Sequence, residues 1–499
     1  MSIKAKPTAT QLSVLLYEYG VRHVVLSPGS RNAPIIIALA ASGRYILHYV
    51  VDERVAAFVA LGIAVSTGQA VAMVCTSGSA ILDYAPAIAE AYYSSIPLIA
   101  ISADRPYYDI DQNKPQTLRQ HGILDNIVRK SVDIRDGEKP DYSNRLLNEA
   151  LQAAVGLMPG PVHINMQFEM PLTPIGETDP VVAYKSQVVR ARELPVFKLE
   201  AALKYLIYIG GLPPGEDVEK CRRLLNTLPC NVAVVAEAQS NLSSCSTVTA
   251  ADFDNGIEYI EKPDIVVLAG SSPVSAKIGS WIGESALTSI HIDPMSRCYS
   301  GKTIAANLSD FLESIAFDNE AQPSVYPIDA AHAKPSRVSR LIEKLSGQDI
   351  MLHLSNGMTV REAQKVKILR PTDVWSNRGV SGIDGATSTA IGSALVSEKP
   401  VVLVTGDMSA AYDVGALAVE GVGGNFTMVV VNNHGGEIFR RVATTRDLPE
   451  RELYFTAMPK FPLAKLADAY GFDYSLITTP EEFEPAMGDK PKIVELIIQ

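Results

Sequence analysis

Residues 401–433 read VVLVTGDMSAAYDVGALAVEGVGGNFTMVVVNN, and this stretch decides the fold. Two apolar runs, Val401–Thr405 and Met428–Val431, have the length of strands and lack the polar alternation of half-exposed ones. The segment between them, Ala411–Gly421, has a mostly helical pattern. A strand, a helix and a second apolar strand predict two neighbours in a parallel α/β sheet.

A pair of polar residues follows each of these strands. Gly406 and Asp407 come after the first strand, and Asn432 and Asn433 come after the second. Because parallel strands end at one edge of the sheet, where open α/β sheets bind ligands, the two pairs belong to one site. A carboxylate from Asp407, an amide oxygen from Asn433 and a carbonyl oxygen near Gly435 are hard ligands of the kind that Mg²⁺ takes beside phosphates.

Two further features favour an anion beside that metal. Gly435 and Gly436 let the backbone approach a ligand closely, and Ser409 at a helix start can donate a hydrogen bond to a phosphate. The alternative is that both motifs are ordinary turns, because Gly, Asn and Asp favour turns everywhere. A Gly-Asp pair by itself indicates a turn, whereas two motifs that each follow a buried strand favour the metal site.

The same alternation of short apolar runs and helical segments extends over the whole chain. It predicts an α/β protein with three doubly wound domains and parallel sheets. We expect the domains at residues 1–178, 190–330 and 336–499, with linkers at Pro171–Leu199 and Asn319–Lys334. The expected helices include Arg54–Ser66 and Ala80–Tyr93, and the expected strands are His23–Ser27, Ile46–Val51, Val71–Cys75, Leu98–Ser102, Val162–Asn165, Asn231–Ala236, Ile265–Ala269, Ser289–Ile292, Met351–Leu354, Val401–Thr405, Met428–Val431 and Ile493–Ile498.

Composition points to an ordinary globular protein. The 499 residues exceed what one hydrophobic core holds, about 250–300 residues, so several domains are expected. A formal charge of -11 argues against a sequence-independent grip on nucleic acid or an anionic membrane. No apolar run approaches the roughly 20 residues of a membrane span, and the N-terminus lacks a signal-peptide pattern. An odd number of cysteines without metal spacing favours reduced thiols in a cytoplasmic protein; they are Cys75, Cys221, Cys230, Cys245 and Cys298.

Eight motifs carry a family resemblance: Ser27–Arg31 (SPGSR), Asp52–Arg54 (DER), Cys75–Ser79 (CTSGS), Ser102–Pro106 (SADRP), Gln116–Gln120 (QTLRQ), Ser376–Gly385 (SNRGVSGIDG), Gly406–Ser409 (GDMS) and Val431–Phe439 (VNNHGGEIF). With them the chain resembles thiamine-diphosphate enzymes of the pyruvate-oxidase and decarboxylase type over its whole length. Those enzymes have a pyrimidine-binding, a central and a diphosphate-binding domain, in that order. Within the group the chain is most similar to the 2-succinyl-5-enolpyruvyl-6-hydroxy-3-cyclohexene-1-carboxylate synthases of menaquinone biosynthesis.

The resemblance implies thiamine diphosphate and Mg²⁺ or Mn²⁺ as cofactors. It gives Glu53 a catalytic role, a hydrogen bond to N1′ of the aminopyrimidine, as general acid–base chemistry requires. The alternative is an ordinary acidic residue at a helix start, where the helix dipole favours one. Ile383 is implied as the apolar wedge between the two cofactor rings. The implied cofactor-binding residues are Glu53, Thr76, Ser77, Gly78, Ser381, Ile383, Gly406, Asp407, Met408, Ser409, Asn433, Gly435, Gly436, Ile438 and Phe439, with Asp407, Asn433 and Gly435 as metal ligands.

The implied substrates are 2-oxoglutarate and isochorismate, both dicarboxylates, which arginine binds in a fork geometry. The implied substrate-binding residues are Ser30, Arg31, Arg105, Gln116, Lys277, Arg361 and Arg378. Arg31, Arg105 and Arg378 each follow a strand at the ligand-binding edge, whereas Arg361 and Lys277 rest on weaker matches. A surface or ion-pair role is the alternative for any single arginine.

The chain departs from the family pattern at one position near these arginines. Related enzymes carry a serine where this chain has Gly357, so one hydroxyl that helps to hold a substrate carboxylate is missing. Ser355 is a candidate to replace it.

The resemblance implies a transferase, a carboligase that decarboxylates 2-oxoglutarate and adds the succinyl-semialdehyde unit to isochorismate. It also implies a homodimer or homotetramer with active sites at the subunit interface, where Glu53 and Asp407 of different chains serve one cofactor. Two alternatives stay open: another carboligase or 2-oxoacid decarboxylase, such as an acetolactate synthase-like enzyme, and a non-catalytic homologue. The arginine cluster argues against the first alternative. The presence of Glu53, Asp407 and Asn433 together argues against the second.

Overall fold

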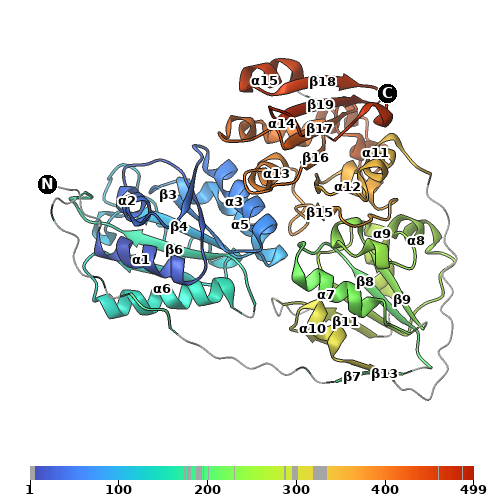
Figure 1. The fold of residues 1–499 in the computed structure, drawn as a ribbon, viewed down its shortest axis with the longest axis horizontal. Helices are drawn as coiled ribbons and strands as arrows, with labels where there is room; N and C mark the ends of the chain where they lie inside the picture. The colour runs from blue at the N-terminus through green and yellow to red at the C-terminus, as the bar shows by residue number, and fades with distance from the viewer. Residues whose placement is uncertain are drawn as a thin grey trace. The chain divides into compact units, whose positions relative to one another are not determined.

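The computed structural model describes residues 6–156, 158–173, 176, 181, 183–186, 194, 196–200, 202–229, 231–285, 288–294, 302–317, 334–458, 460–485 and 487–498. Strands in these ranges form four sheets, two of six strands, one of five and one of two (Figure 1). All paired strands are parallel. The chain divides into two compact units, residues 1–191 with 391–396 and 418–421, and the remainder from 192. The fold is α/β with parallel sheets, as predicted.

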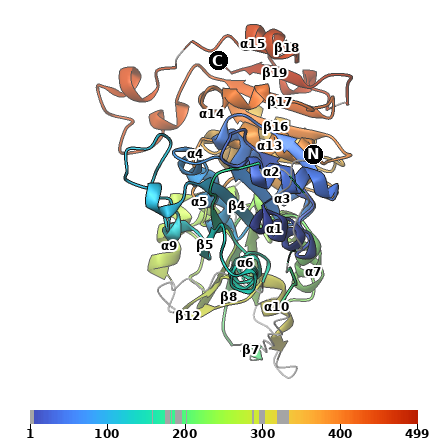
Figure 2. The same cartoon turned by 90° about the vertical axis from the view of Figure 1, so that its left-hand side faces the viewer.

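The first unit contains one six-stranded sheet in the order β2-β1-β3-β4-β6-β5. Its elements are α1 Pro7–Glu18, β1 His23–Leu26, α2 Ala33–Ser42, β2 Ile46–Tyr49, α3 Glu53–Thr67, β3 Val71–Cys75, α4 Ala80–Asp83, α5 Ala85–Ser94, β4 Leu98–Asp104, β5 Ser131–Arg135, α6 Pro140–Val155 and β6 Val162–Gln167. Helices α1, α2 and α6 share one core with the strands, and α1 lies beside α6 (Figure 2). Helix α3 packs against α5 and the central strands β1 and β3.

The second unit begins with a five-stranded sheet in the order β12-β11-β10-β8-β9. Its elements are β8 Tyr205–Ile209, α7 Glu216–Leu225, β9 Val232–Ala236, α8 Ala250–Gly256, β10 Ile265–Ala269, α9 Ala276–Ser285, β11 Thr288–Ile292, β12 Lys302–Ile304 and α10 Leu308–Glu313. Two separate apolar cores lie on this sheet, one under α7 and α10 and the other under α8 and α9. Two short strands, β7 Phe197–Leu199 and β13 Ile315–Phe317, pair with each other beside it.

The second unit also contains the other six-stranded sheet, in the order β15-β14-β16-β17-β19-β18. Its elements are α11 Arg337–Leu345, β14 Met351–Leu354, α12 Met358–Ala363, β15 Asp373–Trp375, α13 Ala386–Ala394, β16 Val401–Gly406, α14 Asp407–Tyr412, β17 Phe426–Asn432, α15 Leu463–Tyr470, β18 Asp473–Ile477 and β19 Lys492–Ile497. The end of α13, from residue 391, belongs to the first unit. Helices α11 and α12 contribute to the core on one face. Strands β16 and β17 are direct neighbours, as the opening stretch predicts.

Each predicted strand is present, with ends within two residues of the prediction. The helix predicted at Ala80–Tyr93 is two helices, α4 and α5. The strands that the sequence analysis missed are β5, β7, β8, β12, β13, β15 and β18, and all but β8 lie at a sheet edge or in the two-stranded sheet; β8 is an interior strand that is buried along its whole length. An edge strand needs only one apolar face. Its sequence is therefore less apolar, and the pattern predicts the strand less clearly.

The prediction that the strands are buried on both faces is wrong for β2. Ile46 and Tyr49 in this strand are 56% and 57% exposed, because β2 is the edge strand and pairs with β1 alone. The central strands β3, β4 and β6 are buried along their whole length, as predicted.

Some predictions fall partly or wholly outside the described residues. Cys230, Cys298 and nearly all of the linker Asn319–Lys334 lie there, as does much of Pro171–Leu199, whose last three residues form β7. Cys75, Cys221 and Cys245 are free thiols. Across the described ranges, no helix is long and apolar enough to cross a membrane.

Candidate active site

Asp407 lies where β16 ends and α14 begins, and it is buried, with 3% of its surface exposed. Its Oδ1 accepts a hydrogen bond from the backbone N–H of Met408 at 2.7 Å, and its Oδ2 accepts one from Gly435 at 2.9 Å. Burial raises the pKa of Asp407, and the backbone donors of Gly435, Met408 and Asn433 oppose that rise. The loop after β17 therefore reaches back to the carboxylate that follows β16, which joins the two predicted halves of the metal site.

Gly435 has a structural reason to be glycine. Its φ is +130°, and a Cβ at this position would lie 1.8 Å from the carbonyl oxygen of Thr456. The N–H of Gly436 donates to that same carbonyl at 3.2 Å. The backbone here is held close to Asp407 without a side chain in between, which fits a cradle for a metal ion and its phosphate ligands.

The neighbouring motif residues line up along the same edge. Asn433 is half-buried, His434 is exposed, and the Asn432 side chain donates to Glu495 Oε1 at 2.6 Å. Met408, Ile438 and Phe439 are half-buried, and Phe439 packs against Phe455. The backbone N–H of Asn433 also donates to Asp407, whereas the Asn432 side chain is bound within the sheet, and the role of the Asn433 amide as a metal ligand stays a prediction.

Ser409 has an internal partner in this structure. Its hydroxyl donates to the carbonyl oxygen of Ile383 at 2.7 Å. A hydroxyl carries one proton, so this contact ties α14 to the loop of Ile383. Its role as a phosphate donor stays a prediction.

The Ile383 loop is held rigidly although the Ile383 side chain itself is 40% exposed. Asn356 Nδ2 donates to the carbonyl of Gly382 at 2.7 Å, and Ser381 has a left-handed φ of +61°. A large apolar side chain that faces outward from a fixed loop is what a wedge between two cofactor rings needs.

Two of the predicted substrate arginines lie close together. Arg378 NH1 donates to Asn356 Oδ1 at 3.0 Å, and Arg361 NH1 donates to the carbonyl of Gly357 at 2.6 Å. Burial lowers the pKa of Arg361, and the positive charge of Arg378 lowers it further. Two cations held near each other against their own repulsion are suited to a carboxylate ligand. Lys277, by contrast, is exposed and pairs with Glu258 at 3.4 Å.

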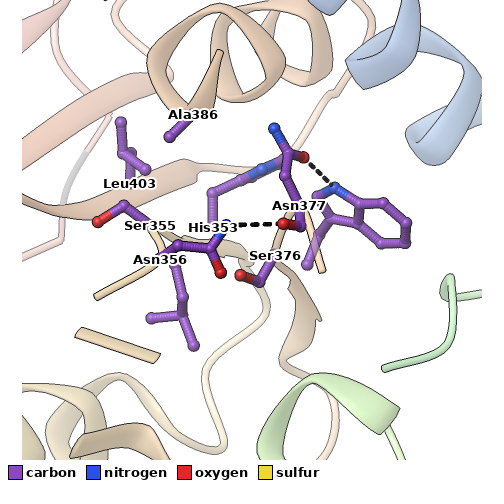
Figure 3. Close-up of a pocket in the computed structure, with 9 residues that line it drawn as sticks. His353, Ser355, Asn356, Ser376, Asn377, Ala386 and Leu403 are labelled. Carbon is purple, nitrogen blue, oxygen red and sulfur yellow. Dashed lines mark hydrogen bonds between the residues drawn. The ribbon is translucent and has the colours of Figure 1, made fainter. Parts of the chain in front are cut away.

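A small pocket lies beneath these loops (Figure 3). Asn356 and Asn377 line it and are joined by a 2.7 Å hydrogen bond from Asn356 Nδ2 to the carbonyl of Asn377. His353 and Ser376 also line it, and His353 Nε2 and Ser376 Oγ are buried without a hydrogen-bond partner among the described residues. Burial lowers the pKa of His353 to about 3, so this ring is neutral and adds no charge to the arginine pair.

Gly357 occupies a backbone conformation that only glycine adopts readily, with φ +99° and ψ −131°. We expect Gly357→Ala to lower the free energy of unfolding by about 1–2 kcal/mol, measured by urea denaturation. Gly357→Ser should lose less, because its hydroxyl at the N-cap of α12 can accept from the helix backbone. If neither variant changes the free energy of unfolding, the backbone conformation at Gly357 is not strained for other residues. Ser355, the proposed substitute hydroxyl, accepts from the N–H of Gly406 at 3.2 Å.

In the first unit, Glu53 occupies the first turn of α3. The Asp52 side chain caps this helix by accepting from the N–H of Val55 at 3.1 Å, which fixes where Glu53 begins the turn. Glu53 is half-buried, and burial raises its pKa, with smaller contributions from the negative charges of Asp83 and Asp52. A carboxyl group that keeps its proton nearer to neutral pH suits proton exchange with a ring nitrogen.

The loop Thr76–Gly78 follows β3 at the carboxyl edge of the same sheet. The N–H of Gly78 donates to Gln120 Oε1 at 2.8 Å, and the Ser77 hydroxyl donates to the carbonyl of Gln116 at 3.0 Å. Gln116 itself is exposed, with a left-handed φ of +53°. The segment that carries Gln116 therefore holds the predicted pyrimidine-binding loop in place.

A second pair of arginines lies in the first unit. Arg31 is buried, and its NH1 donates to the carbonyl of Phe168 at 3.1 Å, while Arg105 is half-buried. Burial lowers the pKa of Arg31, and the charge of Arg105 lowers it further. Asp104 is next to them, and burial raises its pKa to about 6. Ser30 is exposed beside this pair.

Sequence reasoning missed the side chains that hold these groups. Asn356, next to the candidate hydroxyl of Ser355, was given no role. Gln120 and Asn165 are buried, and Gln120 Nε2 donates to Asn165 Oδ1 at 3.0 Å. Asn165 Nδ2 donates in turn to Asp104 Oδ2 at 3.0 Å. The one available signal was the set of polar residues His163, Asn165 and Gln167 in β6, a strand that is buried along its whole length.

Comparisons with known proteins agree with this geometry. Residues 7–123 match the thiamine pyrophosphate enzyme N-terminal TPP-binding domain, and residues 356–492 match the C-terminal TPP-binding domain. Curated relatives named 2-succinyl-5-enolpyruvyl-6-hydroxy-3-cyclohexene-1-carboxylate synthase cover nearly the whole chain. The protein of Porphyromonas gingivalis is 33% identical over 96% of this chain and 92% of its own length. That of Christiangramia forsetii is 32% identical over 98% and 96%, and that of Bacteroides fragilis strain ATCC 25285 is 33% identical over 97% and 93%.

The two domain matches contain every predicted cofactor-binding residue, and the relatives extend the match through the central sheet. The chain therefore belongs to the 2-succinyl-5-enolpyruvyl-6-hydroxy-3-cyclohexene-1-carboxylate synthase family of thiamine pyrophosphate enzymes.

Proposed function

We propose that this chain is a thiamine-diphosphate-dependent transferase that decarboxylates 2-oxoglutarate and joins the succinyl-semialdehyde unit to isochorismate by conjugate addition. The product is 2-succinyl-5-enolpyruvyl-6-hydroxy-3-cyclohexene-1-carboxylate, and the pathway is menaquinone biosynthesis. The observation that carries this proposal is the presence of two buried or half-buried arginine pairs, Arg31 with Arg105 and Arg361 with Arg378, beside the cofactor motifs. Two such pairs suit two dicarboxylate substrates.

The cofactor contacts follow from the two half-sites. Thiamine diphosphate, when bound, supplies the carbon nucleophile and the electron sink of this chemistry. Asp407, the Asn433 side chain and the backbone at Gly435 would hold the Mg²⁺ or Mn²⁺ that carries the diphosphate. Glu53 would hydrogen-bond N1′ of the aminopyrimidine and hold a proton there. Ile383 would keep the two rings bent.

The arginines would orient the substrates and keep water away. Arg361 and Arg378 are fixed by the Gly357 carbonyl and the Asn356 side chain, so little side-chain freedom is lost when a carboxylate binds. Their burial weakens solvent screening and so strengthens each ion pair with a substrate. A site closed to water would also favour addition to isochorismate over simple protonation.

The assembly that we propose is a homodimer or homotetramer. Glu53 belongs to the first compact unit and Asp407 to the second. In this proposal, Glu53 of one subunit and Asp407 of its partner serve one cofactor. A cytoplasmic location stays a prediction from composition and cysteine content.

An acetolactate synthase-like activity is the second candidate and is less well supported. Such an enzyme acts on pyruvate, a monocarboxylate, and needs less positive charge than four arginines supply. It also binds a flavin.

The test is a turnover assay with thiamine diphosphate, Mg²⁺, 2-oxoglutarate and isochorismate, which follows the loss of isochorismate absorbance. Loss that requires all four components is the expected result. Carbon dioxide release from pyruvate or 2-oxoglutarate without loss of isochorismate would refute the acceptor and favour the second candidate. Tight cofactor binding with no reaction of any 2-oxoacid would favour a non-catalytic homologue.

A further inference from the structure

Glu237 is a buried carboxylate to which nothing so far assigns a role. It follows β9 at the carboxyl edge of the central sheet and is 0% exposed. Its Oε1 accepts from the Tyr208 hydroxyl at 2.7 Å and from the N–H of Val274 at 2.7 Å, and its Oε2 accepts from Gln239 Nε2 at 2.5 Å. A carboxylate buried this deeply is costly unless donors or a cation compensate its charge.

One peptide group connects Glu237 to the substrate arginine Arg378. The N–H of Val274, which donates to Glu237, and the carbonyl of Pro273 belong to the same peptide. Arg378 NH2 donates to that Pro273 carbonyl in a long contact of 3.5 Å. Carboxylate, peptide and guanidinium thus form a chain in which each hydrogen bond polarises the next.

Electrostatics agree with this geometry. Burial raises the pKa of Glu237 to about 6, while the Val274 N–H, the Tyr208 hydroxyl and the positive charge of Arg378 lower it. Glu237 is therefore mostly ionised at neutral pH. Burial and the negative charge of Glu237 raise the pKa of Tyr208, and the positive charge of Arg378 opposes that rise.

Arg378 also contacts a residue of the last six-stranded sheet's loops. Its NH1 donates to Asn356 Oδ1 at 3.0 Å, and Asn356 Nδ2 donates to the Asn377 and Gly382 carbonyls. Arg378 is thus clamped between a loop of the central sheet and a loop of the last sheet. A guanidinium held from both sides keeps one orientation toward a carboxylate.

We propose that Glu237 is a positioning residue for substrate binding, which acts through the Pro273–Val274 peptide to hold the Arg378 guanidinium in place. Glu237 of the central sheet then takes part in substrate recognition without touching the substrate itself. The kinetic effect that this inference predicts rests on the proposed function. The positioning of Arg378 does not, because it can be measured without turnover.

The first experiment measures how fast phenylglyoxal modifies Arg378 in the full-length protein, read by peptide mass spectrometry. Glu237→Gln removes the charge but keeps the size of the side chain. We expect phenylglyoxal to modify Arg378 about tenfold faster in this variant, a factor that corresponds to the loss of about one charge-assisted hydrogen bond. Glu237→Asp retains the charge and should lie closer to the wild-type rate. The matched control is Asp217→Asn, which removes a carboxylate of α7 that bonds Ser309. It should leave the rate unchanged.

Buried Arg31 of the first unit is the internal standard. If Glu237→Gln merely loosens the fold, Arg31 also reacts faster, and the proposal is overturned. An unchanged Arg378 rate in Glu237→Gln overturns it as well.

The second experiment is a kinetic cycle. Arg378→Lys identifies the substrate whose KM depends on Arg378. Glu237→Gln should raise that same KM about tenfold with kcat within about twofold, and the double variant should add nothing further. If the losses of the two single variants add in the double variant, or if Glu237→Gln lowers kcat alone, Glu237 has a structural role instead. A wild-type protein without turnover would refute the proposed function while the phenylglyoxal result still decides the positioning.

Discussion

Glu53→Gln is expected to reduce turnover by at least about 100-fold while thiamine diphosphate still binds, because the amide cannot exchange a proton with N1′ as a carboxyl group does. Glu53 occupies the first turn of α3, and burial raises its pKa, which would suit its carboxyl group to that exchange. Isochorismate consumption measures turnover, and calorimetric titration with thiamine diphosphate and Mg²⁺ measures binding.

Asp52→Asn is the matched control for that variant. It removes the neighbouring carboxylate but keeps an N-cap oxygen for the Val55 N–H, so the helix start is preserved. We expect its turnover to stay within a fewfold of the wild type. Full turnover in Glu53→Gln would remove the catalytic role, and loss of cofactor binding in it would point to a binding role.

Asp407→Asn is expected to weaken cofactor binding about 100-fold or more. Loss of partners of a metal ligand already costs about 10–100-fold in metal affinity, and Asp407 is proposed as a ligand itself. The Asp407 carboxylate also accepts a hydrogen bond from the Gly435 N–H at 2.9 Å. In Asp407→Asn, an amide group replaces the carboxylate opposite that N–H. Titration of thiamine diphosphate at several Mg²⁺ concentrations measures the effect, and chelation of Mg²⁺ in the wild type should reproduce it.

Asp413→Asn is the control that separates loss of metal binding from loss of folding stability. Asp413 is fully buried and accepts from the Ser388 N–H at 2.7 Å and from its hydroxyl, in the same part of the chain as Asp407. This variant should unfold at lower urea concentration while its cofactor affinity stays close to that of the wild type. If Asp407→Asn binds cofactor as tightly as the wild type, the metal assignment is wrong.

Local sequence was enough to predict the sheets and the edge where the half-sites lie. The runs at Val71–Cys75 and Val401–Thr405 are apolar on both faces, which only buried parallel strands require. Gly406-Asp407 and Asn432-Asn433 follow adjacent strands, so their meeting at one edge follows from chain direction alone. Strands such as β5 and β18 were missed because an edge position allows polar residues in the run.

The contacts that hold the functional side chains were decided only by the tertiary structure. Asn356 contacts Arg378 and Gly382, Gln120 contacts Gly78, and Glu237 reaches Arg378 through the Pro273–Val274 peptide. These partners lie about 20 to 140 positions apart, beyond any helical or strand period. Apolar runs predicted most of the buried strands, and strand direction predicted the edge where the two motifs meet. The pairing of buried polar groups was settled by packing, because most such groups need a partner in space wherever that partner lies in the chain.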